Sequence, residues 1–155
     1  MTEFNRYLEN EDATLVLGRA LAGMLAPGMV VYLIGDLGAG KTTLARGVLR
    51  GLGFKGHVKS PTFTLVEVYE FSRLYLYHFD FYRFHDPREL GEAGFREYFT
   101  PRSVCLVEWP EKAAGLPPAD LRILMKVAGL AESGRNVQIF ADTEAGVTCL
   151  NGLQL

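Results

Sequence analysis

Apolar and polar positions follow one another along the chain in a pattern that predicts an α/β protein. From Asp12 to Leu25 the apolar residues recur at helical spacing, and either Asp12 or Thr14 can serve as the N-cap. Met29–Gly35 is almost continuously apolar, which is typical of a central strand buried on both faces. A glycine-rich turn follows, and we expect a second helix to begin near Lys41 and to end around residues 51–53.

The middle of the chain predicts antiparallel strands beside this core. Residues 63–71 and 74–82 are rich in β-branched and aromatic side chains and flank Ser72-Arg73, so we expect a hairpin. Further along, a short helix is predicted with Asp86 as its N-cap and Pro87 at its first helical position.

The last third of the chain predicts three more strands. Ser103–Glu108 is apolar and ends on an acid, and residues 121–129 and 135–141 form a predicted closing hairpin around "LAESG". Beyond Ala141 no motif is visible, and we expect a C-terminal strand that packs on the domain. No repeat, low-complexity tract or linker interrupts the chain, which predicts a single domain over residues 1–155.

Composition and charge narrow the class of protein. The chain has 155 residues, 48% of them hydrophobic, and a net charge of −2, which argues against unaided nucleic-acid binding through a broad basic face. Cys105 and Cys149 are far apart and form no metal or redox motif, and Cys105 lies in an apolar run, which favours a buried thiol. The polar, acidic start lacks the form of a signal peptide and no apolar run reaches the ~20 residues of a membrane span, so we expect a cytoplasmic protein without a membrane partner.

The turn between the first strand and the second helix has the pattern of a phosphate-binding loop. Gly35, Gly40, Lys41 and Thr42 satisfy G-x-x-x-x-G-K-[ST]. Glycines let successive backbone N–H groups point inward at phosphate oxygens, and the positive end of the helix dipole faces the same place. The sequence therefore predicts a P-loop NTPase-like three-layer α/β domain with a mixed sheet, a parallel core plus antiparallel hairpin strands.

Two acids can complete such a site. Glu108 ends one apolar strand and Asp80 follows another, and either can serve as the acidic partner of Mg²⁺, with the other positioning water or accepting a proton. In "SPTFTL", Thr62 or Thr64 can sense the γ-phosphate, as switch threonines do. Arg83 can stabilise charge on the phosphate or form a surface ion pair.

The motifs that read guanine are missing from the sequence. Neither N-K-x-D nor a D-x-x-G motif after the second strand is present, which favours ATP over GTP as the nucleotide.

Taken together, "GDLGAGKTT", "SPTF", "DFYR", "EL…G…EYF" and "EWPE" resemble the TsaE family, the bacterial P-loop ATPases of tRNA threonylcarbamoyladenosine biosynthesis. The resemblance implies ATP and Mg²⁺ as cofactors. Thr42 and Glu108 would bind the metal, Asp80 would act on the attacking water, and Thr62 would be the switch threonine. Lys41 would pair with the phosphates. The loop that wraps the phosphates would comprise Asp36, Leu37, Gly38, Ala39, Gly40, Lys41, Thr42 and Thr43.

The same resemblance implies partners. A TsaE-like ATPase is slow alone and works with TsaB and TsaD, so tRNA would be contacted only indirectly, through the complex. The switch loop and the hairpin, residues 63–82, are candidates for the partner surface. By analogy, the adenine would lie between the region near Thr14 and "LAESGRN".

Two alternatives remain open. A small-metabolite kinase of the P-loop type would need lid arginines, for which Arg88, Arg96 and Arg102 are candidates without a recognisable lid. A nucleotide-dependent assembly module would bind ATP without needing hydrolysis. Asp80 discriminates, because only a hydrolysis-driven cycle should depend on it.

Overall fold

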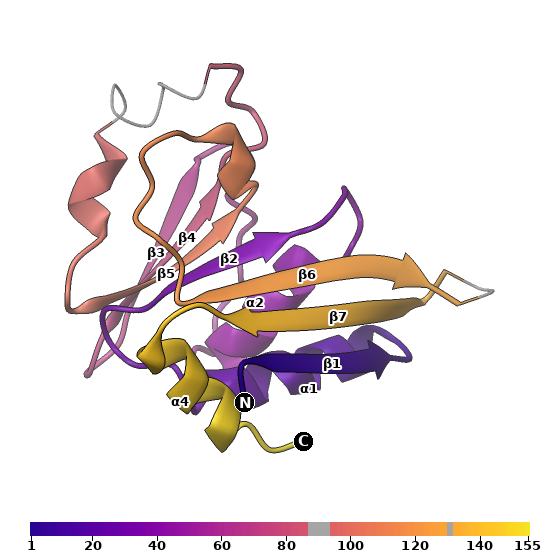
Figure 1. Cartoon of the computed structure of the whole chain (residues 1–155). Coiled ribbons are helices and arrows are strands. Elements are labelled where there is room, and N and C mark those ends of the chain that lie inside the picture. Colours follow the sequence, from indigo (N-terminus) through magenta and orange to yellow (C-terminus); the bar gives the residue numbers. More distant parts are fainter. Residues whose placement is uncertain (87–93, 130–131) are drawn as a thin grey trace.

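The computed structural model describes residues 1–86, 94–129 and 132–155. One seven-stranded sheet runs through it, with strand order β1-β7-β6-β2-β5-β4-β3 (Figure 1). The strands are β1 (Glu3–Leu8), β2 (Val30–Ile34), β3 (Val66–Glu70), β4 (Tyr75–Asp80), β5 (Ser103–Glu108), β6 (Leu121–Ala128) and β7 (Gly134–Ala141). The helices are α1 (Glu11–Ala22), α2 (Lys41–Gly51) and α4 (Glu144–Gly152), with short 3₁₀ helices η1 (Phe95–Tyr98) and η2 (Pro110–Lys112).

The sheet is mixed, as predicted. The four central strands β6, β2, β5 and β4 are parallel, and β3, β7 and β1 extend it with antiparallel pairs. Both predicted hairpins, β3–β4 and β6–β7, are confirmed. β2 is the middle strand and β5 is buried along its whole length, because both faces of this part of the sheet are covered.

Helices α1 and α2 cover one face of the sheet and pack closely on each other. A Cβ on Gly18 would lie 2.5 Å from the Leu44 carbonyl oxygen, and one on Gly47 would lie 2.6 Å from the Leu15 carbonyl oxygen. Only glycine permits this approach. The predicted N-cap of α1 is wrong by two residues or more, because the Asn10 side chain accepts from the Ala13 N–H at 2.9 Å and starts the helix earlier.

The other face carries a second layer of aromatic side chains. Phe79 lies in β4 and Phe81 directly follows this strand. Both are fully buried and lie against Phe95 of η1. η1 occupies the end of the segment for which a short helix is predicted. The predicted helix start at Pro87 lies outside the described residues.

The two ends of the chain differ from expectation. The N-terminal segment forms β1, which no pattern predicted because only Phe4 and Leu8 mark its inner face and Arg6 stands between them. After Ala141 the chain forms helix α4 and not the expected strand. The Thr143 side chain caps α4 by accepting from the Gly146 N–H, and Leu150 joins the core. The chain ends lie close together (Figure 1). The Met1 amino group donates to Asn151 Oδ1 at 2.8 Å.

No helix among the described residues is long and apolar enough to cross a membrane.

Candidate nucleotide site

The phosphate loop lies between β2 and α2, at the carboxyl end of the central parallel strand. Gly40 has φ of 101°, a left-handed conformation in which glycine avoids a Cβ clash, and it serves as the N-cap of α2 without any side-chain cap. A Cβ on Gly35 would lie 2.5 Å from the Met125 carbonyl oxygen, so this position also requires glycine. The first N–H groups of α2 are therefore open to a phosphate.

Most of the residues predicted for the site line one hollow beside this loop. Its volume is about 260 Å³. It is lined by Leu37, Gly38, Ala39, Gly40, Lys41, Thr42, Thr43, Thr62, Asp80, Glu108, Trp109 and Arg135. Of the residues that the TsaE resemblance assigns to the site, only Asp36 is not part of this lining. Five segments that are far apart in sequence thus meet at one edge of the sheet.

Asp80 and Glu108 are the last residues of β4 and β5, and the parallel register pairs them directly. The Asp80 carboxylate accepts from the Tyr82 N–H at 2.8 Å, which holds it at the end of its strand. Burial is the main cause of the raised pKa of Asp80, and the nearby Glu108 charge raises it further. The raised pKa favours proton acceptance by this carboxyl group.

Glu108 faces the phosphate loop. Its two carboxylate oxygens lie 3.2 and 3.1 Å from the Thr42 hydroxyl, and its side chain is almost fully buried. His78 Nε2 lies 2.6 Å from Glu108 Oε2. Hydroxyl and carboxylate oxygens are ligands that Mg²⁺ accepts, so Thr42 and Glu108 fit a magnesium site whose other ligands are phosphate and water. No cluster of three or more His, Cys, Asp or Glu side chains suited to a metal ion occurs in the described parts of the chain.

Thr62, and not Thr64, reaches the acids. The Thr62 hydroxyl donates to Asp80 Oδ2 at 3.3 Å, whereas the Thr64 hydroxyl donates to Glu67 Oε1 at 2.9 Å, away from the hollow. Arg83 donates to the Phe63 carbonyl oxygen at 3.0 Å and is not part of the hollow's lining. Of the two threonines in "SPTFTL", the geometry therefore favours Thr62.

Lys41 is held inside the loop. Its ammonium group donates to the Gly35 carbonyl oxygen and lies 3.6 Å from the centre of the Trp109 ring. Burial lowers the pKa of Lys41, while Glu108 and Asp80 oppose that shift. Trp109 has φ of 58° and is the N-cap of η2, and its ring lies against the ammonium group of Lys41 in the phosphate loop.

Two side-chain contacts at the site were not predicted. Arg135 donates to the carbonyl oxygens of Ala39 at 2.9 Å and Gly38 at 3.0 Å, and so attaches the start of β7 to the phosphate loop. His78 lies two residues before Asp80, on the same face of β4. That period of two was the available signal for His78. Arg135 belongs to "LAESGRN", which the resemblance implies lies near the adenine, but nothing in the sequence pairs its side chain with carbonyl oxygens about a hundred positions earlier.

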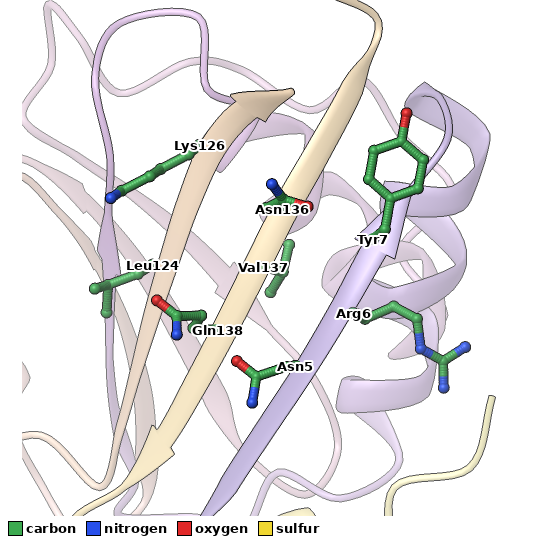
Figure 2. Close-up of a pocket in the computed structure, with 8 residues that line it drawn as sticks. All are labelled: Asn5, Arg6, Tyr7, Leu124, Lys126, Asn136, Val137 and Gln138. Carbon is green, nitrogen blue, oxygen red and sulfur yellow. The ribbon is translucent and has the colours of Figure 1, made fainter. Parts of the chain in front are cut away.

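Several hollows lie outside the phosphate site, and two of them stand out by their place in the fold. One, of about 250 Å³, adjoins it and is lined by Glu11, Thr14, Gly40, Thr43, Ser133 and Arg135, where the adenine is expected. The other, of about 490 Å³, lies on β1, β7 and β6, where paired residues such as Asn5 and Gln138 share the outer face of the sheet (Figure 2). Its lining holds amides and the cations of Arg6 and Lys126 but no acid or nucleophile, and we assign it no chemistry.

Comparison with known proteins agrees with this geometry. Residues 8–137 match the family model of the threonylcarbamoyl adenosine biosynthesis protein TsaE. The chain belongs to the TsaE family. The tRNA threonylcarbamoyladenosine biosynthesis protein TsaE of Haemophilus influenzae is 44% identical over 94% of both chains. The protein of that name from Bacillus subtilis is 44% identical over 77% of this chain and 75% of its own.

The fold has a solved counterpart. The crystal structure of Bacillus subtilis YdiB superposes with a TM-score of 0.80 and 33% identity, over 99% of this chain and 95% of the other. The predicted P-loop NTPase-like α/β fold is thereby confirmed, and TsaE membership makes this a P-loop NTPase-type protein of threonylcarbamoyladenosine biosynthesis.

Proposed function

We propose that residues 1–155 act as one ATP-hydrolysing domain that serves the installation of threonylcarbamoyl on the tRNA adenosine next to the anticodon. The observation that carries the proposal is the convergence of Lys41, Thr42, Asp80 and Glu108 on one hollow beside the phosphate loop. The names of the relatives supply the pathway.

The residues have distinct roles in this proposal. The backbone N–H groups of residues 36–43 surround the phosphates of ATP, and Lys41 leaves the Gly35 carbonyl oxygen to pair with them. Thr42 and Glu108 hold Mg²⁺, which when bound neutralises charge on the β- and γ-phosphates. The adjoining hollow beside Thr14 and Ser133 holds the adenine.

Asp80 orients the attacking water and accepts its proton. Its carboxylate fits this role because it lies beside Glu108 in the register of β4 and β5, whereas the Thr42 hydroxyl donates to Glu108. The Thr62 hydroxyl, 3.3 Å from Asp80 Oδ2, links the 60–64 loop to this carboxylate, so the loop can respond to the γ-phosphate.

Partner proteins complete the proposal. TsaB and TsaD are the expected partners, with tRNA contacted through them in the cytoplasm and without strong direct binding to this chain. Phe63 is 81% exposed and Leu37 is 65% exposed, and both stand in loops that border the nucleotide site. Exposed apolar side chains in such positions are typical of a protein-binding surface, so a partner that covers them also senses the nucleotide.

The test is ATP hydrolysis by the purified protein, first alone and then with TsaB, TsaD and tRNA. Slow turnover that rises with the partners supports the proposal. Turnover that ignores the partners but rises with a small metabolite would instead support a kinase. Full tRNA modification over repeated rounds without any ATP hydrolysis would support the assembly module.

A further inference from the structure

We propose that His78 is a positioning residue that holds the Glu108 carboxylate in the orientation needed to bind the metal ion. This inference rests on the proposed function, because it assigns His78 a role toward the magnesium site. His78 is fully buried on β4, and its Nε2 lies 2.6 Å from Glu108 Oε2. It is not part of the hollow's lining, so it acts through Glu108 and not on the nucleotide.

The direction of the hydrogen bond follows from the chemistry of the pair. An ionised carboxylate can only accept, so the imidazole donates from Nε2. The other ring nitrogen, Nδ1, is buried and has no hydrogen-bond partner among the described residues. A buried polar atom without a partner lowers the stability of a folded protein. Packing alone would favour an apolar side chain at position 78. The presence of a histidine therefore has to be explained by the hydrogen bond that its Nε2 donates to Glu108.

The orientation of Glu108 provides that reason. The terminal torsion of a glutamate side chain has a broad, roughly two-fold preference, so a carboxylate without fixed partners can rotate. Thr42 contacts both oxygens almost equally, at 3.2 and 3.1 Å, and therefore does not select one. His78 contacts Oε2 and thereby leaves Oε1 as the less engaged oxygen beside the Thr42 hydroxyl. Outer partners of this kind orient the ligands of metal sites.

Two variants separate this role from packing. His78→Leu removes the donor and keeps an apolar side chain of similar bulk, whereas His78→Gln places an amide N–H at about the distance of Nε2. We would measure the affinity for Mn²⁺ in the presence of ADP by electron paramagnetic resonance, ADP binding in EDTA, and the thermal unfolding midpoint. His78→Leu should weaken Mn²⁺ binding roughly 10- to 100-fold and leave ADP binding in EDTA unchanged. His78→Gln should stay close to the unaltered protein.

The outcomes are decisive. Mn²⁺ binding that survives in His78→Leu, or that falls equally in both variants, would overturn the positioning role. If His78→Leu does not fold, His78→Asn replaces it, because the shorter amide cannot reach Glu108 and the same weakening is expected. Failure of the proposed function has a different signature, since the unaltered protein would then bind neither Mn²⁺ nor ADP.

Discussion

The Lys41 ammonium group lies 3.6 Å from the centre of the Trp109 ring, and Trp109 is the only tryptophan in the chain. This cation–π contact belongs to a lysine that also donates to the Gly35 carbonyl oxygen. In the proposed function Lys41 turns to the phosphates when ATP binds. ATP binding should therefore remove a cation from the face of Trp109, the side chain that dominates the fluorescence of this protein.

We accordingly expect the tryptophan emission to change when ATP and Mg²⁺ are added, and the change to saturate with nucleotide. Lys41→Met should alter the emission of the free protein and remove most of the response. The measurement is steady-state fluorescence during a nucleotide titration. An equal response in Lys41→Met would show that Trp109 senses something other than this lysine.

Asp80→Asn tests the hydrolysis step. The amide keeps the size and accepts from the Tyr82 N–H, but it cannot take a proton from water. We expect ATP binding to persist and kcat to fall roughly 10²- to 10⁴-fold, the usual contribution of a general base. Single-turnover hydrolysis together with equilibrium binding measures both. Asp142→Asn is a suitable control, because Asp142 pairs with Arg122 at a half-exposed surface position. Repeated rounds of tRNA modification by Asp80→Asn would favour the assembly module.

Arg135→Met tests the contact between β7 and the phosphate loop. The guanidinium group donates to the carbonyl oxygens of Gly38 and Ala39, which orients the loop so that its N–H groups face inward. The substitution removes both charge-assisted hydrogen bonds from Arg135 to the phosphate loop, so we expect the affinity for ATP to fall about 10-fold or more. Calorimetric titration gives the dissociation constant. The matched control is Arg122→Met on neighbouring β6, whose arginine pairs with Asp142 and should leave affinity unchanged.

The contact between α1 and α2 predicts that alanine substitutions at two glycines differ in their effect on stability. Gly18 lies within α1, and Gly23 is the C-cap of this helix. Gly18→Ala would place a Cβ 2.5 Å from the Leu44 carbonyl oxygen, whereas a Cβ at Gly23 meets nothing closer than 3.6 Å. We expect Gly18→Ala to lower the free energy of unfolding by about 1–3 kcal/mol and Gly23→Ala to change it little. Urea denaturation measures both. Equal free energies of unfolding in the two variants would mean that α1 and α2 can move apart without loss of stability.

The two cysteines should be unreactive in the folded protein. Burial raises the pKa of Cys105 to about 12 and that of Cys149 to about 11, so almost no thiolate forms at pH 8. A colorimetric disulfide reagent at pH 8 should react with neither thiol in the native state and with both in denaturant. The unfolded thiols ionise near pH 9 while the folded ones remain protonated, so these two groups make stability fall as the pH rises above 9. Rapid reaction of one thiol in the native state would show that it is accessible.

The order of strands and helices was largely predictable from the sequence because each element is locally consistent. The apolar run of β2, the glycine-rich turn and the helix after it carry their own periodicity and turn residues. β1 and α4 escaped prediction for opposite reasons. β1 has too few apolar residues to show a period of two, and its strand conformation depends on pairing with β7. The nine-residue α4 is held by its Thr143 cap and by packing of Leu150 in the core.

The residue types of the candidate site were also determined by the sequence, since the P-loop motif and two strand-ending acids predict phosphate and metal chemistry. Only the tertiary structure decided how these groups are held. The parallel register pairs Asp80 with Glu108, β4 places His78 against Glu108, and β7 brings Arg135 to carbonyl groups of the phosphate loop. Residue types and local spacing decide which interactions a segment can make, whereas the partner of a buried histidine or arginine is set by strands that are neighbours only in the folded sheet.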